Sequence, residues 1–178
     1  MTKFDRIFVF DNDKDDSDTL NNIIDNIEHS EYFCFGEKGA GNHYLSHTFN
    51  LANLKYQISQ NDLVLFCWSN FHRCDWFIDF KWSNEGNISN PGKYNSLLHP
   101  DLMTLEQCMV RDITNMYSVM TILDGVQTTH YHFKSDFVMF MKLVFEGEVN
   151  DYFELDGIVD YIKPKITRLN GLQHELDN

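Results

Sequence analysis

Short apolar runs alternate along this chain with longer stretches in which apolar residues recur every three or four positions. The runs have the length of strands, and the stretches between them have the period of helices with one buried face. Such alternation is typical of a parallel sheet with helices on both of its faces. The sequence therefore predicts an α/β fold, a three-layer sandwich around a central, mainly parallel sheet. The expected strands are residues 6–10, 32–35, 62–68 and 129–133.

The stretches between these runs predict the helices. The first helix follows the acidic segment and has Ser17 or Asp18 as its N-cap. The second begins at Asn42, whose side chain is suited to cap it, and the third covers residues 104–123. Two more helices are expected at 135–145 and 158–169, where Pro164 would kink or delay the last one. The length of 178 residues predicts a single domain over residues 1–178.

A cluster of carboxylates follows the first apolar run, in the segment FDND at residues 10–13. Ligands of open parallel sheets bind beyond the carboxyl ends of the strands, so this position matters. Asp11 and Asp13 have three interpretations: a helix start, a cation site, or the D-x-D pair of a Mg²⁺-dependent phosphatase. The third resembles the haloacid dehalogenase superfamily, with Ser69 in its second motif, but the later motifs of that superfamily are missing. Because carboxylates favour the positive end of a helix dipole, the helix start is the interpretation we favour.

Three segments carry a second resemblance: GAGNHYLSHTF at 39–49, NDLVLFCWSNFHRCDWF at 61–77 and LDGIVDY at 155–161. They resemble the second, third and fifth sequence blocks of the SGNH/GDSL hydrolases. More narrowly, they resemble the SGNH-like proteins of marine bacteriophages and their hosts. The resemblance covers most of the chain and implies a flavodoxin-like sandwich. It also implies that Gly39 or Gly41, together with Asn70, stands on the oxyanion side of a site.

The catalytic half of that family's site is missing here. Members use a Ser after the first strand as nucleophile, and the His of an Asp-x-x-His motif as base. Asn12 or Asp13 stands at the position of the Ser, and Val159 stands where the His belongs. A chain that lacks both groups has lost the chemistry of acyl transfer. The residues expected to form the vestigial site are Asp11, Asn12, Asp13, Gly39, Gly41, Asn42, Asn70 and Asp156.

We therefore expect a catalytically degenerate SGNH-like protein that serves as a binding or structural module. The alternative is an active hydrolase, either an esterase with a relocated nucleophile or a phosphatase that uses Asp11 and Asp13. His72 and Arg73 follow the third run and are the expected ligand-binding residues, since an Arg can hold a carboxylate or sulfate. Arg73 could equally pair with Asp75 or Asp79 of its own chain.

Two pairs of histidines are the remaining candidates for metal ligands. His43 and His47 are four residues apart on an expected helix, and His130 and His132 lie on the same side of an expected strand. Either pair could supply half of a zinc site, but a catalytic zinc takes three protein ligands and no HExxH motif is present. We expect no metal and no cofactor.

The segment from residue 71 to residue 103 is irregular and rich in aromatic residues. An insertion of this length is typical of a functional surface, so we expect a protein partner or self-association there. The alternative is that its aromatic residues turn inward as a lid. A net charge of -13 argues against nucleic acid and anionic membranes as partners.

Four cysteines without a CxxC pair predict reduced core thiols. The N-terminal segment lacks the features of a signal peptide, and no apolar run reaches the ~20 residues of a membrane span. These features predict a cytoplasmic protein, in the host cytoplasm or the virion if the origin is viral.

Overall fold

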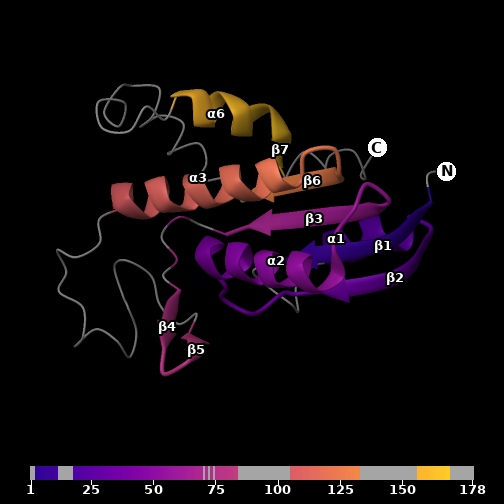
Figure 1. Cartoon of the computed structure of the whole chain (residues 1–178), viewed down its shortest axis with the longest axis horizontal. Helices are drawn as coiled ribbons and strands as arrows, with labels where there is room; N and C mark the ends of the chain where they lie inside the picture. The colour runs from indigo at the N-terminus through magenta and orange to yellow at the C-terminus, as the bar shows by residue number, and fades with distance from the viewer. Residues whose placement is uncertain are drawn as a thin grey trace.

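The centre of the molecule is a five-stranded sheet with the strand order β2-β1-β3-β6-β7 (Figure 1). The computed structural model describes residues 3–11, 18–69, 71, 73, 75–83, 105–132 and 156–168. Every neighbouring pair of strands in this sheet is parallel, which confirms the α/β fold class. The strands are β1 (Phe4–Phe10), β2 (His29–Cys34), β3 (Asp62–Trp68), β6 (Gln127–His132) and β7 (Ile166–Arg168).

Four helices of the described chain lie between these strands in the sequence. They are α1 (Asp18–Asp25), α2 (Asn42–Tyr56), α3 (Leu105–Ile122) and α6 (Asp156–Ile162). The chain starts in the middle of the sheet at β1, moves outward to β2, and then returns past β1 to form β3 on its other side. The direction of winding therefore reverses between β1 and β3. In open parallel sheets, ligands bind where this reversal opens a crevice at the carboxyl ends of the strands.

Alternate side chains of β1 lie on opposite faces of the sheet. Ile7 and Val9 pack into a cluster with α1, whereas Phe8 and Phe10 pack into a second cluster with α2 and α3. Every residue of β3 is buried. A strand that is covered on both faces needs a continuous apolar run, which is why these strands could be recognised in the sequence.

The amino-terminal edge of the sheet is held by a bidentate ion pair. Arg6 donates from Nε to Oδ1 of Asp62 at 2.8 Å and from Nη2 to Oδ2 at 2.7 Å. Its Nη1 also donates to the carbonyl oxygen of Tyr56 at 2.9 Å, where α2 ends. Burial raises the pKa of Asp62, but the hydrogen bonds from Arg6 and Ser59 outweigh it and the pKa is lowered. The pair fixes the start of β3 against β1.

The expected strands are confirmed, with small shifts at their starts. β2 begins at His29 and β6 at Gln127, a few residues before the expected positions. The predicted helix at 158–169 is wrong beyond Ile162, because Lys163–Lys165 form a 3₁₀ turn and β7 follows. Pro164 lies in that turn, where its missing N–H ends the helix. The helix predicted at 135–145 lies outside the described residues.

The prediction of core thiols is correct for two of the cysteines. Cys34 and Cys67 are free thiols, and Cys67 and Cys108 are buried. Cys34 is exposed, because β2 is the edge strand of the sheet and only one of its sides is paired. Cys74 lies outside the described residues.

The insertion contains an antiparallel hairpin of β4 (Trp76–Ile78) and β5 (Lys81–Ser83). Figure 1 shows the hairpin away from the main sheet, near the end of the molecule toward which the β3 arrow points. Residues 84–103 lie outside the described part of the chain. Within the described part, no helix combines the length and the apolar character needed to cross a membrane.

Candidate functional site

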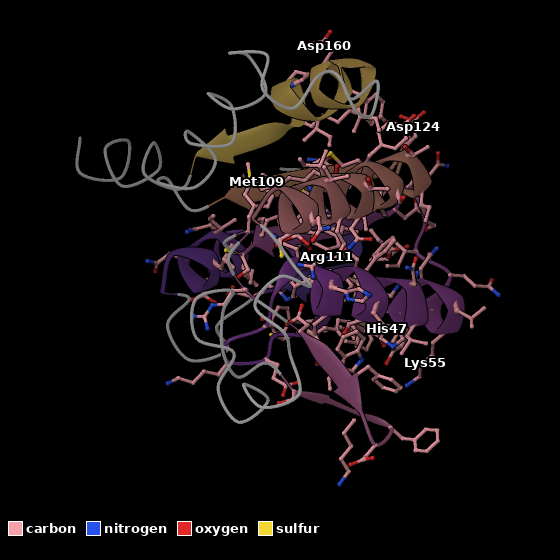
Figure 2. All side chains as sticks on the ribbon, turned by 90° about the vertical axis from the view of Figure 1, so that its left-hand side faces the viewer. His47, Lys55, Met109, Arg111, Asp124 and Asp160 are labelled. Carbon is pink, nitrogen blue, oxygen red and sulfur yellow. The ribbon has the colours of Figure 1, made fainter. Side chains whose placement is uncertain are left out.

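The carboxyl ends of the strands, which face the viewer in Figure 2, carry the residues that the sequence singled out. Asp11, Gly39, Gly41, Asn42 and Arg73 are described there. Asn12, Asp13, Asn70 and His72 lie outside the described residues, and only the backbone of Asp156 is described, at the start of α6.

Asn42 connects the end of β3 to helix α3. Its side-chain oxygen accepts a hydrogen bond from the backbone N–H of Ser69 at 2.7 Å, and its Nδ2 donates to the carbonyl oxygen of Ser69 at 3.0 Å. The same Nδ2 donates to Oδ2 of Asp112 at 2.8 Å. The prediction that Asn42 caps α2 is therefore wrong. Gly41 is the N-cap residue, and the Asn42 amide is directed to β3 and α3 instead.

Asp112 is a fully buried carboxylate in the middle of α3. Its Oδ1 accepts a hydrogen bond from Nε of Arg111 at 2.7 Å and lies 2.7 Å from Nη2 of the same residue. Burial raises the pKa of Asp112 to about 6, although Arg111 and Asn42 oppose this shift. Asp112 is therefore close to half protonated near pH 6. In Figure 2, Arg111 lies between α3 and α2.

A second buried carboxylate, Asp75, is bound to the first turn of α2. Its Oδ1 accepts the N–H of Gly41 at 2.7 Å, and its Oδ2 accepts the N–H of Tyr44 at 2.8 Å. These are backbone donors that a helix leaves unsatisfied at its N-terminus. Sequence reasoning missed this role, because Asp75 lies 34 residues after Gly41 and no local motif relates them.

The buried position of Asp11 bears on the interpretation of the acidic segment. Asp11 is buried at the end of β1, and α1 begins only at Asp18. Burial raises the pKa of the Cys67 thiol, and the adjacent Asp11 carboxylate, to which the thiol donates, raises it further. Asp11 therefore belongs to the edge of the core rather than to a solvated helix start. The later acids of the segment lie outside the described residues.

Gly39 is the residue of the α2 entry turn for which a glycine is required. Its φ of +79° lies in the left-handed region, which residues with a Cβ adopt at a cost. Gly41 has ordinary extended backbone, with φ of -97°, but a Cβ there would lie 2.6 Å from Oδ2 of Asp75. Both glycines named by the sequence resemblance thus shape the start of α2, the first through its φ and the second through its contact with Asp75.

The β4–β5 hairpin packs on α2 through Trp82. The rings of His43 and His47 each lie 5.1 Å from the Trp82 ring, centroid to centroid, and Tyr44 lies 5.8 Å away. His43 and His47 therefore share one helix face, as predicted, and Figure 2 shows His47 on the side of α2 near the hairpin. Burial and the neighbouring Arg111 and His47 lower the pKa of His43.

The hairpin also carries the most exposed aromatic residues of the described chain. Phe77 is 57% exposed and Phe80 is 93% exposed, whereas Phe71 at the base of the insertion is buried. The aromatic residues of the insertion therefore divide, some turning inward and some outward. The side chain of Trp76 lies outside the described residues, as does Tyr94.

No protein-family model matches the sequence, and comparison with curated proteins finds none that is significantly similar. The described residues also contain no group of three or more His, Cys, Asp or Glu side chains arranged to hold a metal ion. The function is therefore argued from the geometry of the carboxyl edge and the hairpin.

Proposed function

We propose that this chain is a catalytically degenerate, SGNH-like protein that acts as a binding module, with the β4–β5 hairpin as its docking element. The strand order, which reverses between β1 and β3, is consistent with a flavodoxin-like three-layer sandwich. On the sequence resemblance, we assign the protein a bacteriophage origin and a place in the host cytoplasm or the virion.

The polar groups at the carboxyl edge support a structural role. Asn42 bonds both backbone groups of Ser69 as well as Asp112, and Asp112 is in turn held by Arg111. Asp75 is bound to two backbone N–H groups of α2. A general base or a nucleophile must be able to reach a substrate atom. These side chains instead bond one another and the backbone.

The observation that carries the proposal is the conformation of the hairpin tip. Asp79 and Phe80 have φ of +51° and +60°, the left-handed values of a two-residue hairpin turn that Asn-Gly normally fills. A side chain with a Cβ costs roughly 1–2 kcal/mol in that region. Phe80 is almost fully exposed there, so its ring does not contribute burial that would offset the strain. An aromatic residue at such a position is explained by contact with another molecule.

The base of the hairpin is fixed, which suits a docking element. Asp75 bonds two amides of α2 directly before β4, and Trp82 of β5 packs on three aromatic rings of the same helix. Phe77 lies 5.3 Å from Trp82 and is half exposed beside the tip. A rigid tip loses little entropy on binding. The net charge of -13 favours a partner protein with a basic rim over a second copy of this chain.

Phe80→Asn tests this proposal, because Asn tolerates the left-handed conformation and keeps the turn. We expect the variant to lose partner binding while its thermal midpoint stays the same or rises. Leu54→Gln is the matched control, since Leu54 is 80% exposed on α2 and is replaced by a helix-forming residue. Affinity purification from the source cells and sedimentation velocity measure partner binding and self-association. Equal association of the wild type and Phe80→Asn would contradict the docking role.

Enzyme assays test the other half of the proposal. We expect no turnover of short acyl esters. We also expect that the substitution Asp11→Asn causes no loss of phosphatase activity. Ester hydrolysis that disappears when a single Ser or His is replaced would instead establish the esterase alternative.

A further inference from the structure

The segment that leads from β3 to the hairpin is attached to the helices by two side chains. Asn42 of α2 bonds both backbone groups of Ser69, at 2.7 Å and 3.0 Å. Farther along the segment, Nη2 of Arg111 in α3 donates to the carbonyl oxygen of Arg73 at 3.4 Å. The strength of each attachment therefore depends on what else orients the Asn42 amide and the Arg111 guanidinium.

One carboxylate orients both of these side chains. Asn42 donates to Oδ2 of Asp112 at 2.8 Å, and Nε of Arg111 donates to Oδ1 of Asp112 at 2.7 Å. Asp112 is completely buried, so water is not at hand to replace either donor. Asp112 touches neither Phe80 nor the exposed tip, and it can act on the hairpin only through Asn42 and Arg111.

Protonation of Asp112 weakens the bond to Arg111 first. A protonated carboxyl group exchanges an acceptor position for a donor, and it loses the charge that strengthens a hydrogen bond from a guanidinium. Asn42 is fully buried, and its two bonds to Ser69 fix the orientation of its amide. The Arg111 side chain is 24% exposed and can move toward water. A proton on Asp112 therefore releases Arg111, and with it the carbonyl oxygen of Arg73.

The surroundings of Asp112 bring this change into the mildly acidic range. The charged groups that face Asp112 from the described residues are Arg111 of its own helix and Asp75 of the segment before β4. α2 adds the neutral amide of Asn42, and the described side chains of β3 and α6 add no charge. Burial and the Asp75 carboxylate raise the pKa of Asp112 to about 6, against the opposing effects of Arg111 and Asn42.

We propose that Asp112 is a positioning residue whose negative charge holds the hairpin in place, and that its protonation loosens the hairpin by releasing Arg111 from Arg73. Asp75 lies two residues after Arg73 and directly before β4, so the loosened segment includes the carboxylate that bonds the first turn of α2. The consequence for binding rests on the docking function proposed for Phe80. A loosened hairpin loses more entropy on docking, so association should be weaker in acid.

The pH dependence of two N–H groups, measured by NMR, tests the proposal without any partner. In the wild type, the Nε–H of Arg111 should be protected from exchange at pH 7 and lose that protection as Asp112 takes up its proton. The backbone N–H of Tyr44, which Asp75 accepts, should lose protection roughly tenfold between pH 7 and pH 5.

Two variants separate Asp112 from other titrating groups. Asp112→Asn should show the released Arg111 already at pH 7, with no further change down to pH 5, because the Asn side chain cannot titrate. Asp124→Asn is the matched control, since Asp124 is exposed just beyond the end of α3 and its loss removes the same charge outside the cluster. It should behave as the wild type.

Protection of both N–H groups that stays constant from pH 7 to pH 5 in the wild type would overturn the proposal. An acid loss of protection that persists in Asp112→Asn would also overturn it, because another group would then be responsible. Partner binding is measured separately. Association that is lost in Phe80→Asn but equal at pH 7 and pH 5 contradicts the control by Asp112 and leaves the docking function intact. Absence of association at both values contradicts the docking function, while the two N–H groups still decide the role of Asp112.

Discussion

Asp112 is a buried carboxylate whose pKa is strongly changed by the fold. It is completely buried in α3, and its carboxylate is bonded by Asn42 and Arg111. Burial raises its pKa to about 6 in spite of these two partners. The folded state therefore binds a proton to Asp112 at a pH where the unfolded chain, with an ordinary pKa near 3.8, does not. Stability from this group is greatest at acid pH and is lost as the pH rises toward 6.

Asp112→Asn should isolate this contribution. The wild type should gain about 2 kcal/mol in unfolding free energy relative to the variant when the pH falls from 7 to 4. Asn keeps an acceptor for Asn42 but cannot titrate, so the difference between the two proteins reports Asp112 alone. Urea unfolding at pH 4, 5, 6 and 7 measures it. A difference that does not change over this range would mean that Asp112 keeps an ordinary pKa.

At the scale of single residues, the sequence identified residues of the candidate site but did not predict their contacts. Asn42 and Gly41 were recognised because they follow an apolar run, but the partners that define their roles were not. Asn42 bonds Asp112 over 70 residues, and Gly41 bonds Asp75 over 34 residues. Such contacts depend on the packing of α2 against α3 and the hairpin. No spacing in the sequence encodes them.

Among the elements, α2 depends on Asp75, the residue directly before β4, for the start of its first turn. The N-cap Gly41 has an extended backbone that any residue adopts, so Gly is not required there for its conformation. The requirement is contact: a Cβ at Gly41 would lie 2.6 Å from Oδ2 of Asp75 and 3.0 Å from Cβ of Arg73. A side chain at this position would push the Asp75 carboxylate away from the helix.

Gly41→Ala should therefore cost roughly 1–3 kcal/mol in unfolding free energy, because it separates buried hydrogen-bond partners. The Tyr44 amide should lose protection from hydrogen exchange, since Asp75 is its acceptor. Gly157→Ala in α6 is the matched control, because a Cβ there meets no atom of the described residues within 4 Å. Unchanged Tyr44 protection in Gly41→Ala would show that the helix start tolerates the methyl group without losing Asp75.

The success of element prediction followed the strength of the local pattern. β1 and β3 were found because both are buried on two faces and read as continuous apolar runs. β7 and the two hairpin strands have three residues each, too few for a period to be visible. β7 exists because Ile166 pairs with His130 of β6, which is a tertiary contact. The prediction from the sequence instead continued the preceding helix through the residues of β7.

For the molecule as a whole, two buried groups make stability depend on pH in opposite directions. His130 of β6 is 1% exposed, stacked near Phe66 and Trp68, and burial, together with Lys165, lowers its pKa to about 3. The unfolded chain takes up this proton near pH 6.5, so stability is lost as the pH falls below that value. Between pH 7 and 5 the loss from His130 is about 2 kcal/mol, and the gain from Asp112 is about 1 kcal/mol. The gain from Asp112 therefore offsets about half of the loss from His130.

His130→Phe should remove the loss of stability that His130 causes as the pH falls. A phenyl ring can take the stacked position against Phe66, and the substitution deletes the His130 Nε2 group, which is buried without a hydrogen-bond partner among the described residues. It also removes the acceptor of the Trp68 indole N–H, so we expect the variant to be less stable at pH 7. Its pH dependence is the diagnostic quantity: relative to the wild type, it should gain about 2 kcal/mol when the pH falls from 7 to 5.

Urea unfolding of the wild type, His130→Phe and Asp112→Asn at pH 5 and 7 tests this balance. Acidification should stabilise His130→Phe by about 1 kcal/mol and destabilise Asp112→Asn by about 2 kcal/mol, with the wild type between them because only the wild type keeps both groups. The comparison within each protein removes the constant effect of each substitution, including the unpaired indole N–H. Parallel pH dependence in all three proteins would mean that neither buried group controls acid stability, and that the exposed carboxylates of this acidic chain do so instead.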